Sequence, residues 1–281
     1  MFLSNLTELT MSQGYRRFFK VVPALTDELR AENYRIRHEV YCRELGYEPL
    51  RPEGLEADAY DEQSLHCLVQ SVSTGEFVGC ARLVLIDPKI AQQARLPLEI
   101  SCAETLDRSL VDPLTLDRSR IAEISRLAVI GSYRRRPGEK NRPISIAEED
   151  FGTAKQPRQP YLALAVYLCL IALARHYGIT TLFVLTEPRL ASNLTRMGVK
   201  VTQIGGAIEH RGTRIPSMLS VEEIIDGMNF VLRALFEVVS REVQEGITAA
   251  GKNAVRAGHH PSSWPYTQPC TPSPSHSLPQ G

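Results

Sequence analysis

Apolar residues near the start of the chain predict a helix that ends at a glycine. Between residues 27 and 45 they recur at helical rather than alternating spacing. They are Leu29, Ile36, Val40 and Leu45. Gly46 then supplies a helix stop. Arg37 and Tyr41 stand four residues apart on this helix, so they share one face and can point into a single site.

Three strand-like runs follow this helix. Residues 65–72 and 77–86 flank a Thr-Gly pair, which is a hairpin signal. Residues 121–130 form the third run, after a mixed segment at 88–113 that reads as an insertion with a short helix. The acidic segment 51–63, just before the hairpin, contains Pro and Gly and is expected to form a loop over a cleft.

The second half of the chain alternates helices and strands before it becomes polar. The expected elements are an irregular basic segment over 131–160, a helix over 161–177 closed by Gly178, a strand over 182–186, a helix from Pro188 to near Gly198, a strand pair over 199–208 and 213–219, and an amphipathic helix over 221–247. From Gly251 to Gly281 the sequence is rich in Pro, Ser, Gly and His. Such a segment cannot bury a core, so a disordered tail is predicted there.

These elements predict one α/β domain with a C-terminal helical extension. The expected parts are an N-terminal extension over 1–14, the domain itself over 15–220, an amphipathic helix over 221–249 and a disordered tail over 250–281.

Composition narrows the function classes. Lys plus Arg and Asp plus Glu both number 32, and this balance argues against wholesale binding of nucleic acid. The six cysteines form no C-x-x-C pair and no zinc-ligand spacing, so no metal site is expected. The most apolar stretch, 161–174, is shorter than the roughly 20 residues that cross a bilayer. With no secretory signal at its start, the chain is expected to be a soluble cytoplasmic protein.

Two arginines stand inside apolar strands. Arg82 lies within 77–86 and Arg126 within 121–130. A charged side chain in such a position is costly unless an acid neutralises it. The natural partners are Asp58, Asp61 and Glu123. The sequence therefore predicts a buried ion-pair network that lines a cleft.

Four separated motifs together resemble the acyl-homoserine-lactone autoinducer synthases and the related N-acyl amino acid synthases. Those families carry an R-x-x-V-F/Y-x-x-x-L-G-W/Y helix, a D-x-x-D loop, a strand G-x-x-R and an E-x-S-R strand in this order. The matching positions are Arg37, Val40, Tyr41, Leu45, Gly46, Tyr47, Asp58, Asp61, Gly79, Arg82, Glu123, Ser125 and Arg126. The sequence looks most like the acyltransferases associated with the PEP-CTERM/exosortase system, which share the Y-R-I-R-H-E-V-Y pattern and a later L-T-E-P-R-L segment. This resemblance covers residues 15–219.

The resemblance implies a GNAT-like fold: a twisted mixed sheet, flanked by helices, that splays at its centre and accepts a pantetheine arm. The glycine-rich turn that binds the diphosphate of coenzyme A in GNAT proteins is missing after Val129. An acyl carrier protein lacks the nucleotide, so its absence favours an acyl-phosphopantetheine donor on such a carrier over acyl-CoA. The basic run Arg134, Arg135 and Arg136 is a candidate docking surface for an acidic carrier. No bound cofactor is expected.

Aminolysis of a thioester requires a proton acceptor and a donor for the developing oxyanion. Glu123 is the candidate proton acceptor, directly or through a water. Ser125 positions the acceptor or protonates the leaving thiolate, and a backbone N–H near 127–129 stabilises the oxyanion. Arg126 completes the catalytic set, although an ion pair that only braces the fold is the role favoured for it. The residues expected to shape the pocket of a small amine acceptor are Arg37, Tyr41, Tyr47, Asp58, Asp61 and Arg82.

Two alternatives remain open at this point. One is an acyl-homoserine-lactone synthase that uses S-adenosylmethionine, against which Tyr47 weighs, since those synthases usually carry Trp there. The other is a non-catalytic GNAT-like protein that binds acyl carriers for envelope or polysaccharide assembly.

Overall fold

An eight-stranded mixed sheet forms the centre of the molecule. The computed structural model describes residues 11–86, 94–111, 116–134, 152–153, 156–157, 161–196 and 198–256. The strands of this sheet are β1 (Phe19–Pro23), β2 (Ser64–Ser71), β3 (Phe77–Leu85), β4 (Ile121–Val129), β7 (Thr181–Thr186), β8 (Thr202–Gln203), β9 (Ile208–Glu209) and β10 (Thr213–Ser220). Their order is β1-β2-β3-β4-β7-β10-β8, with β9 paired to β10. The short strands β5 (Gly152–Thr153) and β6 (Gln156–Pro157) pair separately.

The sheet is antiparallel except at its centre. Strands β1 to β4 are joined as antiparallel neighbours, and so are β7 and β10. Between these two halves, β4 and β7 run parallel, and their pairing covers only Ile121–Ile124 against Thr181–Val184. The remaining residues of β4 continue beyond the last pair without β7 beside them. The sheet is therefore split along the carboxyl-terminal half of β4, which confirms the expected splay.

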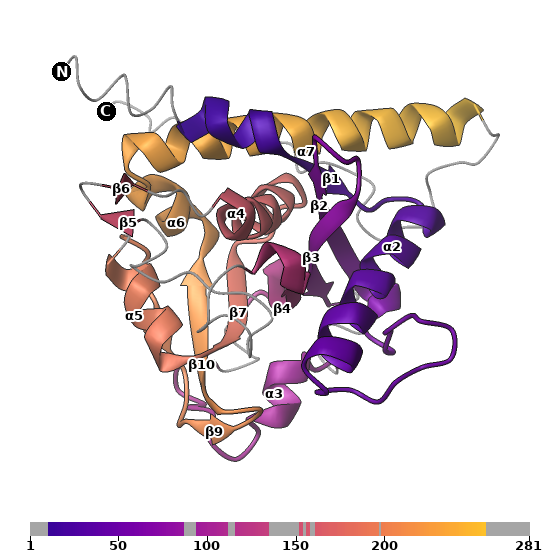
Figure 1. Ribbon diagram of the computed structural model, residues 1–281. Coiled ribbons are helices and arrows are strands. Elements are labelled where there is room, and N and C mark those ends of the chain that lie inside the picture. The colour runs from indigo at the N-terminus through magenta and orange to yellow at the C-terminus, as the bar shows by residue number, and fades with distance from the viewer. Residues whose placement is uncertain are drawn as a thin grey trace, which may run out of the picture.

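Helices cover both faces of the sheet (Figure 1). They are a helix at 11–18, α2 (Asp27–Arg37), α3 (Pro97–Ser101), α4 (Tyr161–His176), α5 (Pro188–Arg196), α6 (Val221–Gly227) and α7 (Phe230–Arg256). A π-helix, η1 (His38–Glu44), continues α2 directly, and Gly46 ends it with φ +62°. Short 3-10 turns occur at η2 (Asp61–Gln63), η4 (Arg118–Arg120) and η5 (Gly131–Tyr133).

Residues of β3 show how the two faces of the sheet differ. Val78, Ala81 and Leu83 pack into the apolar cluster that holds α4 and α7. On the opposite face, Cys80 packs against α2, and Val84 packs into a second cluster with α3. The charged site described below lies on this second face, between the two clusters.

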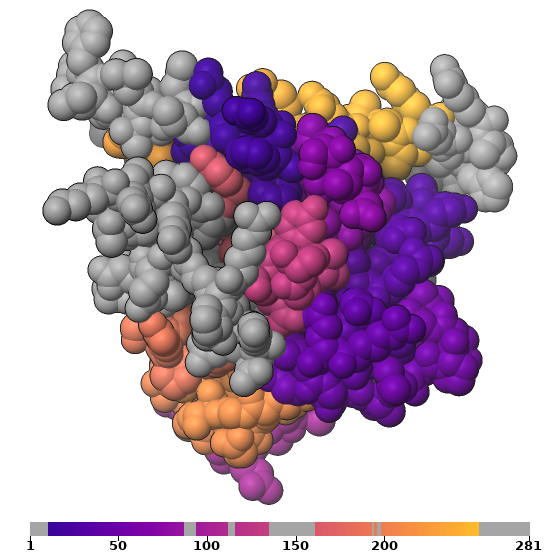
Figure 2. Space-filling model, in the orientation of Figure 1, coloured from indigo at the N-terminus to yellow at the C-terminus, as the bar shows by residue number. Residues whose placement is uncertain are grey.

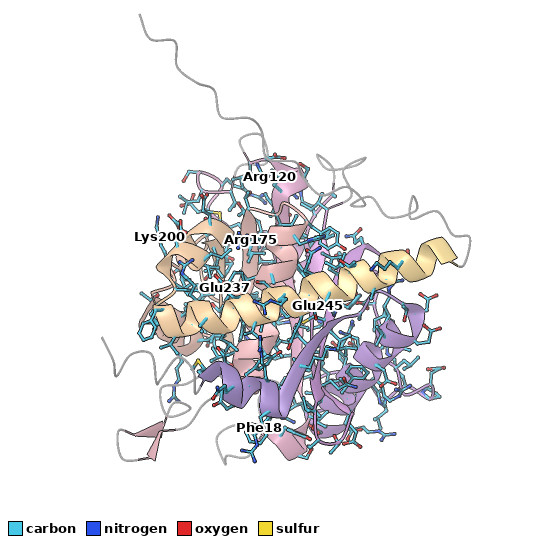
Figure 3. The ribbon with its side chains drawn as sticks, turned by 90° about the horizontal axis from the view of Figure 1, so that it is seen from above. Phe18, Arg120, Arg175, Lys200, Glu237 and Glu245 are labelled. Atoms are coloured by element: carbon cyan, nitrogen blue, oxygen red, sulfur yellow. The ribbon has the colours of Figure 1, made fainter. Side chains whose placement is uncertain are left out.

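The C-terminal helix covers the edge of the sheet. Figure 3 shows α7 lying across the molecule beside the 11–18 helix, which ends at Phe18. The Glu242 carboxylate of α7 accepts hydrogen bonds from the Tyr15 hydroxyl at 2.6 Å and from the backbone N–H of Val21 in β1 at 3.0 Å. A free strand edge can pair with another chain, and this contact uses one of its donors.

Three boundary predictions were wrong. The single helix expected over 221–247 is two helices, because Asn229 caps a new start by accepting the N–H of Leu232 at 3.0 Å. The expected extension over 1–14 already contains helix from residue 11, and Met11 and Tyr15 are buried in the core. The tail expected from residue 250 begins as the last turns of α7, which runs to Arg256; the rest of the tail lies outside the described residues.

The other predicted elements agree with the structure in type. The hairpin, the short helix of the 88–113 segment, the strand β4 and the helix α4 all occur where the sequence placed them. The strand predicted over 199–208 is reduced to the short strands β8 and β9. Most of 135–160 lies outside the described residues.

Candidate active site

A bulge in β4 brings the motif residues of that strand onto one face. Opposite β3, Ser125 pairs with Arg82 and Ala128 with Cys80, so Arg126 and Leu127 together face the single residue Ala81. Arg126 adopts φ +53°, an unusual backbone conformation for a residue with a side chain. A bulge changes the alternation of side chains along a strand. As a result, the neighbouring residues Ser125 and Arg126 both contact the charged face instead of opposite faces.

Arg37 is the most deeply buried cation of the site. Its side chain has no solvent exposure, and its Nε donates to Glu56 at 2.5 Å. Its two terminal nitrogens donate to both oxygens of Asp61, at 2.6 and 3.1 Å. Such a bidentate geometry satisfies the planar guanidinium and fixes its orientation.

The two strand arginines join the same acids. Arg82, 1% exposed, contacts Asp58 at 2.6 Å and Asp61 at 2.8 Å, and its Nε donates to the Ser125 hydroxyl at 3.2 Å. Arg126 contacts Asp58 at 3.1 Å and Glu56 at 3.3 Å. The predicted buried ion-pair network is therefore confirmed for Arg82, Asp58 and Asp61.

The prediction that Glu123 pairs with the strand arginines was wrong. Glu123 makes no ion pair with either strand arginine among the described contacts; its place is taken by Glu56, which lies two residues before Asp58. The sequence alone did not identify Glu56, because a loop has no side-chain periodicity from which its partners could be predicted. Glu48 also joins the network, at 3.5 Å from Arg126.

Burial divides the network into a shielded part and an open part. Arg37, Arg82 and Asp61 have side chains at most 4% exposed, whereas Asp58 and Arg126 are 26% and 21% exposed. Arg37, Arg82 and Asp61 form the shielded part, and Asp58 and Arg126 form the open part. The shielded three are among the residues expected to shape the acceptor pocket, and this role stays a prediction.

Charge holds the acids of the network in their ionised form. Burial raises the pKa of Glu56 and of Asp61, but Arg37 together with Arg126 for Glu56, and with Arg82 for Asp61, holds both pKa values below their ordinary range. Burial also raises the pKa of Asp58, and Arg82 and Arg126 together bring it below its ordinary range. These three carboxylates are therefore ionised near neutral pH.

Tyr41, Tyr47 and Arg211 lie next to Arg126 at the edge of the network. The Tyr41 hydroxyl donates to the Leu127 carbonyl of β4 at 2.7 Å, and Arg126 lies over the Tyr41 ring. Tyr47 lies beside Tyr41, and Arg211, at the tip between β9 and β10, lies over the Tyr47 ring. The structure brings Tyr41 and Tyr47 together next to Arg126, and their contact with an acceptor stays a prediction. No signal in the sequence pointed to Arg211, which lies 164 residues from Tyr47.

Arg211 joins the β9–β10 tip to the loop that follows η1. It ion-pairs with Glu48 at 2.5 Å and donates to the Tyr47 carbonyl at 3.2 Å. Its own backbone has φ +55°, which gives the tip its shape with Gly212 behind it. The residues from η1 to Glu48 and the β9–β10 tip thus meet beside Arg126.

Glu123 is a buried acid of a different kind. It lies on β4 two residues before Ser125, and its Oε2 accepts the backbone N–H of Leu98 at 2.7 Å. Burial raises the pKa of Glu123 to about 8, because the hydrogen bond from Leu98 and the more distant arginines only partly offset desolvation. A carboxyl with a pKa near the working pH can both take up and release a proton.

Arg134 does not present its charge to solvent as the docking prediction requires. Its side chain is 6% exposed and forms an ion pair with Glu44, the last residue of η1. Arg135 and Arg136 lie outside the described residues. Figure 2 shows the pink-magenta surface of the segment ending at residue 134 between the purple N-terminal elements and the orange C-terminal strands.

The described residues contain no cluster of His, Cys, Asp and Glu side chains suited to a metal ion. Within that same part of the chain, no helix has the length and apolar character needed to span a bilayer.

Comparisons with known proteins agree with the fold. Residues 36–141 match the family described as "Acetyltransferase (GNAT) domain", and these residues include the helix, loop and two strand motifs that contain Arg37, Asp58, Arg82 and Glu123. No curated protein sequence matches the chain. The crystal structure of TofI, in complex with an inhibitor and MTA, is 18% identical with a TM-score of 0.51, and the match covers 76% of this chain and 99% of TofI.

Two further solved structures are similar at lower scores. MesI, a CoA-dependent acyl-homoserine lactone synthase, is 22% identical with a TM-score of 0.48 over 79% of this chain and 93% of MesI. FeeM, an N-acyl amino acid synthase from uncultured soil microbes, is 14% identical with a TM-score of 0.48 over 75% of this chain and 94% of FeeM. The mixed sheet with its flanking helices is a GNAT-like acyltransferase fold.

Proposed function

We propose that the protein is an N-acyltransferase that moves a fatty acyl group from a phosphopantetheine thioester to a small amine, such as an amino acid. The observation that carries this proposal is the free edge of β4 beside the buried carboxyl of Glu123. In the reaction the amine nitrogen bonds to the thioester carbon, the carbon–sulfur bond breaks, and the amine proton leaves through Glu123. The leaving thiolate is protonated by Ser125 or by Glu123 itself.

The free edge of β4 offers backbone donors for the oxyanion. The N–H of Ile130 donates to Val78 of β3 at 3.0 Å, and consecutive residues of a strand direct their backbone groups to opposite edges. Leu127 and Val129 therefore direct theirs away from β3, where pairing with β7 has already ended at Ile124. Tyr41 takes up the Leu127 carbonyl on this edge. The N–H groups of this segment are our candidates for the oxyanion donors.

The open part of the network suits an acceptor that carries an amine. Asp58 and Glu48 each keep about a fifth or more of their side chains exposed, beside Arg126. A carboxylate there can hold an ammonium group until it loses its proton, while the shielded arginines keep the carboxylate in place.

Features of the sequence support our proposals for the acyl donor and for the biological setting of the reaction. The missing glycine-rich turn after Val129 supports an acyl carrier protein as the donor. The Y-R-I-R-H-E-V-Y and L-T-E-P-R-L segments support an association with the PEP-CTERM/exosortase system.

A direct assay tests the proposed reaction. Purified protein is incubated with a long-chain acyl carrier protein and pooled amines, including amino acids and S-adenosylmethionine, and the products are identified by mass spectrometry. We expect amides of one amine class. A lactone product would instead identify an acyl-homoserine-lactone synthase, and tight carrier binding without any product would identify a binding protein.

Carrier docking has its own test. Since Arg134 is buried and paired with Glu44, the docking proposal depends on the charges of Arg135 and Arg136. The double replacement by Glu is expected to weaken carrier binding by at least about tenfold at low salt. The loss should shrink as salt rises, because exposed charges are screened. An unchanged affinity at low salt would remove these residues from the docking surface. The exposed Arg175, at the end of α4, is a suitable charge-reversal control.

A further inference from the structure

One carboxylate outside the network occupies the turn that follows β4. Glu44 comes from η1, 87 residues earlier in the chain, and its Oε1 accepts the backbone N–H of Gly131 at 2.8 Å. Its Oε2 pairs with the guanidinium of Arg134. The Glu44 side chain is 23% exposed and that of Arg134 is 6% exposed, so the pair is largely withdrawn from water.

The backbone donors of this turn are nearly all used inside the protein. Ile130 donates to Val78 at 3.0 Å, Tyr133 to Ile130 at 2.9 Å and Arg134 to Gly131 at 3.0 Å. The Gly131 N–H is taken by Glu44. Of the five N–H groups from 130 to 134, four therefore have a protein acceptor.

A backbone N–H next to a guanidinium is the combination that binds phosphate oxygens in many proteins. Here the protein fills that position with its own anion. The fit is close, because a Cβ added to Gly131 would stand 2.8 Å from Glu44 Oε1. An external phosphate at this point would have to displace Glu44 or accept repulsion from a like charge in a poorly solvated place.

The turn at 131–134 matters because the far end of an acyl donor would lie beside it. A donor that lies along the free edge of β4, with its reacting carbon near Leu127 and its arm directed towards the end of the strand, has its far end near the turn at 131–134, because that turn directly follows the strand. The diphosphate of a coenzyme A donor is at that far end.

We propose that Glu44 is a specificity-determining residue that excludes donors carrying a diphosphate and leaves phosphopantetheine held by a carrier protein as the substrate. This inference rests on the proposed function for the identity of the reaction, but the occupation of the turn by Glu44 is independent of it.

A series of donors with the same acyl group tests the proposal. Acyl-pantetheine carries no phosphate, acyl-4′-phosphopantetheine carries one, and acyl-CoA carries the diphosphate. For the wild-type protein we expect kcat/KM for acyl-CoA to be at least about tenfold below that for acyl-pantetheine. In Glu44→Gln, which keeps the shape and removes the charge, this ratio should rise by about tenfold. An unchanged ratio in Glu44→Gln would overturn the proposal.

Glu39→Gln is the matched control. Glu39 lies on the same π-helix and its ion pair with Arg43 is exposed, at 3.3 Å, so the variant makes the same change in net charge at a distance from the turn. Its donor ratio should equal that of the wild type. If Glu44→Gln does not fold, the wild-type series still decides, because equal use of acyl-CoA and acyl-pantetheine would contradict the proposal.

Binding of CoA itself separates this inference from the proposed reaction. Calorimetric titration with CoA requires no turnover, and we expect Glu44→Gln to bind it at least about tenfold more tightly than the wild type. Absence of amide with every donor would remove the proposed function and leave Glu44 to be judged by this titration. Equal affinities of the two proteins for CoA would overturn the role of Glu44.

Discussion

Replacing Glu123 by Gln is expected to slow amide formation by at least about 100-fold, the usual contribution of a general base. The amide side chain cannot accept the proton that the amine must lose. Folding should be unaffected at pH 7, because the Gln oxygen can still accept the Leu98 N–H that Glu123 Oε2 now accepts at 2.7 Å. The measurement is single-turnover kinetics with a chosen acyl donor, alongside urea unfolding.

The pH dependence gives this prediction a second readout. The wild-type rate should rise with pH and level off above about 8, the pKa to which burial raises Glu123, and Glu123→Gln should lack this limb. The free energy of unfolding should change in the opposite direction. Glu123 binds its proton more tightly in the folded protein than in the unfolded chain, so wild-type stability falls as pH rises from 4.5 towards 8. The Gln variant lacks this loss, so it should become progressively more stable than the wild type across this pH range.

Glu99→Gln is the control for Glu123→Gln. Glu99 is a buried neighbour on α3, but it is paired with Arg118 at 2.7 Å and lies outside the proposed chemistry. Its replacement should lower stability and leave the pH limb of the folded enzyme intact. If Glu123→Gln reacts at the wild-type rate, or if its rate shows the same rise with pH as that of the wild type, Glu123 is removed from the mechanism.

Replacing Arg37 by Met is expected to lower the free energy of unfolding by about 3 kcal/mol, because removal of one partner leaves buried charges uncompensated. Met retains much of the volume of the side chain, so the loss reports mainly on charge. Asp61 keeps Arg82, and Glu56 keeps Arg126, which places the effect at the lower end of the range for broken buried pairs. The measurement is urea unfolding at pH 7.

Arg35→Met is the matched control on the same helix. Arg35 is 58% exposed and pairs with Glu32 in solvent, so its replacement should cost no more than about 0.5 kcal/mol. Equal losses in the two variants would contradict a special role for the buried pair.

The difference between wild type and Arg37→Met should shrink in acid. The pKa values of Asp61 and Glu56 are depressed in the folded protein, so the stability they confer is present above their ordinary values of 3.8 and 4.5 and is lost as pH falls through the depressed values. Without Arg37 these pKa values rise and less stability remains to be lost. Two pH–stability curves that stay parallel down to pH 3 would contradict this account.

The sequence was sufficient for the elements and for part of the network. Periodicity located α2, the β2–β3 hairpin, β4 and α4, because each buries an apolar face whose repeat is local. The need to neutralise Arg82 identified Asp58 and Asp61, since few acids stood near enough in the expected fold. The split of the sheet came from the family resemblance, not from the spacing.

Tertiary structure alone decided which charges meet. Glu123 and Glu56 are both acids near the motif, but Glu123 lies earlier on β4, opposite Val84, and accepts the N–H of Leu98, and the path of the 51–63 segment brings Glu56 to Arg37. The bulge that turns Arg126 to the acids depends on two strands held in register, and the contacts of Arg211 and Glu44 join segments 164 and 87 residues apart. A sequence fixes which residues must be buried or paired, because that depends on their own chemistry; the choice of partner depends on distances that only the folded chain defines.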